Sequence, residues 1–94
     1  MPMTADELTI NYEEDGTVKV KELDKVFLSK GAWTTIMFLY QELDTRTGQM
    51  SEPKISIRRY KKSGDVYRQQ SKFNITNQKQ AFQIVDCIKK WFGT

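Results

Sequence analysis

Histidine is absent from this 94-residue chain, and cysteine occurs once, as Cys87. Without an imidazole, the sequence cannot pair a serine or cysteine nucleophile with a histidine base. With a single thiol, it also has no set of metal ligands at a familiar spacing. It also lacks the glycine-rich loop that cradles phosphate groups. These absences predict a protein that is not an enzyme and that needs no cofactor or metal.

Long apolar runs are missing as well, and no signal-peptide pattern precedes the first acidic residues. The expected location is therefore the cytoplasm, which is compatible with association with the nucleoid, and no membrane partner is expected. One cysteine cannot form an intrachain disulfide, so Cys87 is expected to be a small buried or half-buried side chain.

The chain is long enough for one small domain, since 38% of its residues are hydrophobic. A domain of this size has a small core, so a homodimer that covers a further apolar face is expected. Charge is unevenly distributed along the chain. Residues 1–50 contain nine acidic and five basic side chains, whereas residues 51–94 contain three acidic and ten basic side chains. The basic second part favours an anionic partner, although a lysine-rich surface also serves solubility.

The first half of the chain predicts a hairpin over residues 8–29 after a flexible terminus at 1–7. Apolar side chains alternate from Leu8 to Tyr12, and Asp15-Gly16 is typical of a two-residue turn with positive φ at both positions. The return strand begins at Thr17. Its alternation breaks at residues 22–24, where we expect a bulge or a short turn.

Central strands are predicted over residues 32–75. The stretch from Ala32 to Leu43 is apolar on both faces, so it should lie centrally and face a second surface besides its own helix. Residues 44–53 form a polar loop. The next two strands, joined by a turn at 63–65, alternate apolar side chains with a polar, basic face. That face carries the predicted nucleic-acid-binding residues, which are Lys54, Arg58, Tyr60, Lys62, Arg68 and Lys72.

An amphipathic helix is predicted over residues 76–92, where the apolar period changes from 2 to 3.6. Thr76 or Asn77 caps its start and Gly93 ends it. The fold class expected from these elements is α+β, with a curved antiparallel sheet of four or five strands and one C-terminal helix packed across it. The side chains expected to be largely buried are Ile36, Phe38, Leu39, Ile57, Phe73, Ile84, Val85 and Ile88.

A basic strand face with an aromatic ring indicates a binding module for single-stranded DNA or RNA. Cations neutralise phosphates, and an aromatic ring such as Tyr60 offers a stacking surface for bases. The only predicted helix is expected to pack its apolar stripe against the sheet. It is therefore not expected to lie in the groove of a duplex. The alternative is a small protein-interaction or dimerisation module whose basic face is merely solvated.

The order of three strands and a helix, with the stretches ISIRRY, KFNIT and TNQKQAFQIVDCIKKWF, resembles the single-stranded-DNA-binding domain of the coactivator positive cofactor four. The resemblance covers Trp33 to Phe92, and the related Whirly proteins share the general architecture. It implies single-stranded DNA binding by a homodimer, in transcription or DNA maintenance, with Arg58, Tyr60 and Lys72 at matching positions. Arg59 stands where that family commonly has an acidic residue, and the hairpin from Leu8 to Leu28 has no counterpart.

Overall fold

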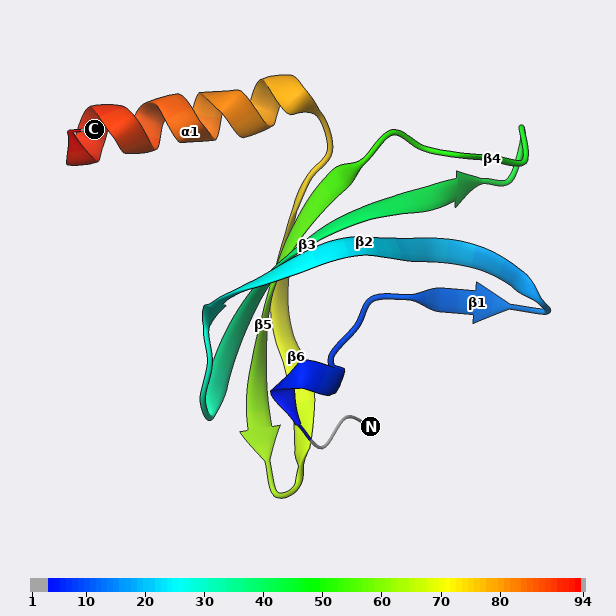
Figure 1. Cartoon of the computed structure of the whole chain (residues 1–94), viewed down its shortest axis with the longest axis horizontal. Helices are drawn as coiled ribbons and strands as arrows, with labels where there is room; N and C mark the ends of the chain where they lie inside the picture. Colours follow the sequence, from blue (N-terminus) through cyan, green and yellow to red (C-terminus); the bar gives the residue numbers. More distant parts are fainter. Residues whose placement is uncertain (1–3, 94) are drawn as a thin grey trace.

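A computed structural model describes residues 4–93 of the chain. Within these residues it contains one antiparallel sheet in the order β1-β2-β3-β5-β6, with β4 paired to the far end of β3. Figure 1 shows the sheet curling along its length and the helix α1 at its end. The elements are η1 (Ala5–Glu7), β1 (Tyr12–Glu14), β2 (Thr17–Ser29), β3 (Trp33–Asp44), β4 (Gln49–Met50), β5 (Lys54–Ser63), β6 (Val66–Ile75) and α1 (Gln78–Phe92).

The predicted fold class is confirmed as a curved antiparallel sheet with one C-terminal helix packed across it. Asp15 and Gly16 have φ values of 51° and 79°, so the β1–β2 turn has the two positive φ angles that its sequence predicts. The register of β2 against β3 shifts between Glu22 and Asp24, where the alternation breaks. Local sequence therefore determines both the turn and the bulge of this hairpin.

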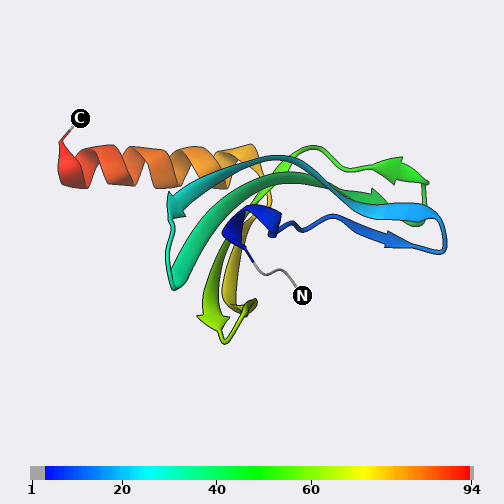
Figure 2. The same ribbon diagram turned by 60° about the horizontal axis from the view of Figure 1, so that its bottom comes forward.

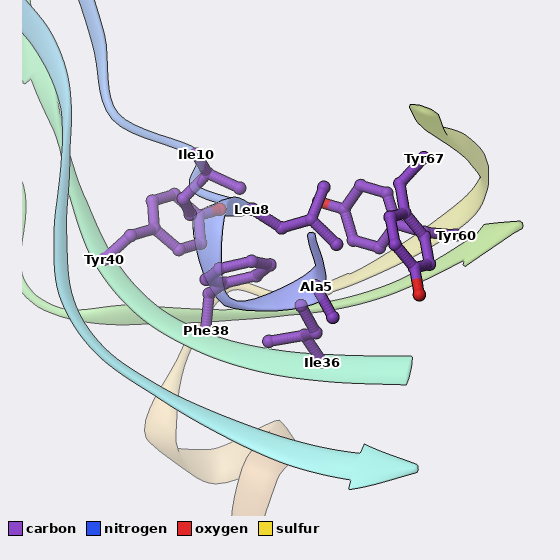
Figure 3. Close-up of a cluster of buried hydrophobic side chains, with 8 residues drawn as sticks. All are labelled: Ala5, Leu8, Ile10, Ile36, Phe38, Tyr40, Tyr60 and Tyr67. Atoms are coloured by element: carbon purple, nitrogen blue, oxygen red, sulfur yellow. The ribbon is translucent and has the colours of Figure 1, made fainter. Parts of the chain in front are cut away.

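One face of the sheet, here called the inner face, is covered by the N-terminal segment that precedes β1. Figure 2 shows this segment inside the curve of the strands. Its apolar side chains pack on β3, β5 and β6, as Figure 3 shows. The resulting core consists of Ala5, Leu8, Ile10, Ile36, Phe38, Tyr40, Tyr60 and Tyr67.

The start of the chain differs from its prediction. Leu8 and Ile10 were expected in a first strand, but β1 begins only at Tyr12. Both side chains are buried against the inner face, because covering that face removes more apolar surface from water than a solvated edge strand does. Ala5 is buried in η1, within the stretch 1–7 that was predicted to be flexible. Residues 1–3 of that stretch lie outside the described residues.

The opposite, outer face has an apolar area that is largely open in the single chain. Of the side chains predicted to be buried, Ile36 and Phe38 are buried on the inner face, whereas Ile57 on the outer face and Ile84 of α1 are half-buried. The prediction of burial is wrong for four other side chains, because only the first turns of α1 reach the sheet. Those exposed side chains are Leu39, Phe73, Val85 and Ile88.

Helix α1 begins and ends where its sequence predicts. The Asn77 side chain accepts a hydrogen bond from the Gln80 backbone N–H at 2.8 Å, and Gly93 is left-handed with its N–H bonded to the Lys89 carbonyl. The first half of the helix packs near the Ile55 and Ile75 end of the sheet, and the rest extends beyond it (Figure 1). Cys87, predicted to be buried or half-buried, is exposed. No helix in residues 4–93 is long and apolar enough to cross a membrane.

Candidate nucleic-acid interface

The predicted basic strand face belongs to the inner face, on the same side of the sheet as the core. Ile36 lies opposite Arg58 and Phe38 lies opposite Ser56 in the β3–β5 register. Since directly opposed residues share a face, the polar face of β5 adjoins the apolar core. Ile57, which was expected to be largely buried, therefore faces away from the main core, because that core lies on the other side of β5.

A chain of side-chain hydrogen bonds crosses this inner surface. Ser56 Oγ donates to Asn74 Oδ1 at 2.6 Å, and Arg58 Nε donates to Ser56 Oγ at 3.0 Å. Arg58 Nη1 donates to Gln69 Oε1 at 3.0 Å. The guanidinium is thus fixed from two sides, and its remaining N–H donors can bind an anion.

Arg58 and Lys72 form a cross-strand pair of like charge. They are register partners in β5 and β6, which places their Cβ atoms about 5 Å apart. The salt bridges among residues 4–93 join Lys30 to Asp6, Arg46 to Asp44 and Lys54 to Glu42, and none includes Arg58 or Lys72. Two opposed cations without a carboxylate destabilise a sheet, so this pair is the strongest sign of an anion site on the inner face.

Lys54 and Tyr60 are the two predicted binding residues whose side chains are least free to contact nucleic acid. Lys54 Nζ donates to Glu42 Oε1, and this bond raises the pKa of the ammonium group above its usual value. The Tyr60 side chain is 5% exposed in the core. Burial raises the pKa of its hydroxyl, and the nearby Arg58 opposes that rise. The prediction that Tyr60 presents an open ring for stacking is therefore wrong for this conformation.

Arg68 and Lys62 lie nearer the β5–β6 turn. The register shifts between Arg59 and Tyr60, so that Gln70 is an extra residue in β6. Arg68 was predicted to share a face with Lys72, but the shift makes it the register partner of Lys61 instead. Lys62 Nζ lies 6.0 Å from the centroid of the Tyr67 ring. The structure thus brings together Arg58 and Lys72, and the extra residue Gln70 takes Arg68 out of line with Lys72.

A groove of about 530 Å³ runs between the N-terminal segment and the β5–β6 strands. Arg58 and Gln69 lie at this groove together with Arg68 and Gln70, while Leu8 and Thr9 form its other wall. Its volume is in the range of small-ligand sites. Tyr60 and Tyr67 also line it, so cations and amides converge on a groove that includes two largely buried tyrosine side chains.

Comparisons with protein-family models, with curated proteins and with solved structures found no match.

Sequence reasoning missed Gln69 and the groove wall. Alternation placed Gln70 rather than Gln69 beside Lys72, because it did not allow for the bulge. The wall comes from a segment about 50 residues away in sequence, and its apolar alternation resembled a strand. Nothing in the local pattern of β6 could have revealed either feature.

Proposed function

We propose that this protein binds single-stranded nucleic acid on the inner face of β5 and β6, with DNA favoured by the resemblance to positive cofactor four. The observation that carries the proposal is the opposed pair Arg58 and Lys72, which has no carboxylate partner among residues 4–93. A phosphate between the two cations would remove their repulsion.

The groove at Arg58 fits a single strand better than a duplex. It is bounded on one side by Leu8 and Thr9, so a ligand must be narrow enough to lie between the N-terminal segment and β6. Hydrogen-bonding amides, including those of Gln69 and Asn74, line the same surface. Such groups bind sugars, phosphates and exposed base edges without requiring one sequence.

A homodimer completes the proposal. The chain exposes 6872 Å² of surface, whereas a compact monomer of this mass exposes about 5,600 Å². Its radius of gyration is 15.1 Å, compared with about 12 Å for a compact chain of 94 residues. The excess area exceeds the roughly 800 Å² that each partner contributes to a standard interface.

The apolar surface that a second copy would cover is continuous with the sheet. It joins the outer face of the strands to the exposed stripe of α1, and Phe73 and Ile88 are 52% and 48% exposed. The helix of each copy would lie on the apolar part of its partner's outer face, around Phe73, so a two-fold arrangement buries both surfaces at once. The inner-face groove and the Trp33 end of β3 would remain open to nucleic acid.

The proposal is tested by fluorescence anisotropy of a labelled oligothymidylate, titrated with the protein at low and moderate salt. A duplex of equal length serves as the control. We expect tighter binding to the single strand and weaker binding at higher salt, because cations displace condensed counterions from phosphates. Equal absence of binding to both probes would favour the alternative, a protein-interaction module with a solvated basic face.

A further inference from the structure

Trp33 begins β3 on the outer face, and two cations lie against its ring. The indole is 43% exposed. Arg59 Cζ lies 4.5 Å from its centroid, and Lys61 Nζ lies 5.3 Å from it. Cation–π attraction therefore holds both basic side chains at an open aromatic surface.

A second like-charge pair adjoins this ring. Lys61 and Arg68 are register partners, as Arg58 and Lys72 are on the inner face. No salt bridge within residues 4–93 involves Arg59, Lys61 or Arg68. Two cations against one exposed indole, with a third on the next strand, are the combination that a single strand of nucleic acid requires, since phosphates need cations and bases need a ring.

The inner face supplies the cations but no open ring. Tyr60 and Tyr67 are only 5% and 8% exposed there, so neither offers a free face to a base. Arg68 connects the two surfaces, because it lines the inner groove and is also the register partner of Lys61. It belongs to β6, which is an edge strand of the sheet. A single strand of nucleic acid can therefore pass round this edge of the sheet from the inner face to the outer face.

We propose that Trp33 is a base-stacking platform for single-stranded nucleic acid and that Arg59, Lys61 and Arg68 bind the adjoining phosphates on the outer face. This inference rests on the proposed function, and it adds a second contact site to the inner one. The Arg59 guanidinium lies over the indole ring. Guanidinium planes also stack on bases, so a base can stack either on the guanidinium or on the exposed part of the indole.

The experiment uses Trp91→Phe protein, in which Trp33 is the remaining tryptophan of the two in the sequence. Labelled oligothymidylate is added while probe anisotropy and Trp33 fluorescence are both recorded. We expect the fluorescence to be quenched over the same concentration range in which anisotropy rises. Trp33→Ala should weaken binding by about 5- to 150-fold and leave the salt dependence unchanged, because stacking releases no ions. Arg59→Gln with Lys61→Gln should instead reduce the log-log salt slope by about 1.4.

The outcomes separate this site from the inner one. If binding requires Arg58 and Lys72 but Trp33 is not quenched and Trp33→Ala binds normally, the outer site is wrong and the proposed function stands. If no oligonucleotide binds, the proposed function fails with it. If Trp33→Ala changes the sedimentation of the protein but not its affinity, Trp33 belongs to a protein interface and the inference is overturned. If Trp33→Ala does not fold, the variant Arg59→Gln with Lys61→Gln decides. A salt slope in that variant equal to that of the wild-type protein would overturn the outer site.

Discussion

Arg58 and Lys72 lie directly opposite each other on neighbouring strands, and both are cations. Hydrogen bonds to Ser56 and Gln69 hold the Arg58 guanidinium in place. Repulsion between Arg58 and Lys72 destabilises the sheet of the free protein. An anion bound between the two charges would remove this repulsion, which explains the pair. Stability and binding should therefore respond in opposite directions when this pair is changed.

Lys72→Glu should stabilise the fold by about 0.2 to 1 kcal/mol, because it converts a repulsive cross-strand pair into an attractive one. The same change should weaken binding of oligothymidylate. Urea unfolding and anisotropy measure the two effects. Lys21→Glu is the matched control, since Lys21 is an exposed strand lysine opposite the neutral Gln41. If both variants lose affinity equally, the effect comes from net charge and not from the pair.

Tyr60 should behave as a core residue. Tyr60→Ala is expected to cost about 3 kcal/mol of unfolding free energy, as for other large aromatic side chains removed from a core. Tyr60→Phe, which keeps the ring, should lose much less. Thermal melting of both variants checks this. Full stability in Tyr60→Ala together with lost binding would mean that the ring contacts the ligand instead.

Alkaline pH should reduce stability partly through Tyr60. Burial raises the pKa of its hydroxyl, so the phenol ionises in the unfolded chain before it does in the folded one. The stabilisation is complete below the unfolded pKa of about 10 and is lost as the pH rises through the folded pKa. Tyr60→Phe should show a smaller loss of urea stability between neutral pH and pH about 10.5. An identical loss in both proteins would contradict this assignment.

The exposed stripe of α1 should mediate self-association. Ile88→Glu places a charge in the apolar surface that the second copy is proposed to cover, so sedimentation should shift toward the monomer. Gln83→Glu adds the same charge at an exposed position on the polar side of the helix. Monomeric wild-type protein at high micromolar concentration would contradict the dimer.

Local signals in the sequence predicted most elements of the fold. The Asp15-Gly16 turn and the cap at Asn77 are short-range features, and each depends on a few neighbouring residues. Alternation also separated the two faces of β3 correctly, with Ile36 and Phe38 on one side and Trp33 on the other. These features need no knowledge of distant packing.

The sequence determined the predicted site less well. The alternating pattern of β5 and β6 separates two faces of the sheet, but it does not show which face another segment of the chain covers. Leu8 and Ile10 decide this by packing on the inner face, and the sequence around β5 contains no sign of them. The extra residue Gln70 then moves Arg68 out of line with Lys72. Both effects arise from long-range pairing, which a local period cannot report.

The salt dependence of oligothymidylate binding tests the central proposal most directly. Wild-type protein should give a log-log slope near −3 if about four cations neutralise phosphates. Arg58→Gln with Lys72→Gln should weaken binding and reduce the magnitude of the slope by about 1.4, since about 0.7 is lost for each phosphate contact removed. Lys89→Gln with Lys90→Gln, at the far end of α1, is the control of equal charge and should leave both values unchanged. A slope near zero in wild-type protein, or an equal loss in the control, would contradict the proposed inner-face site.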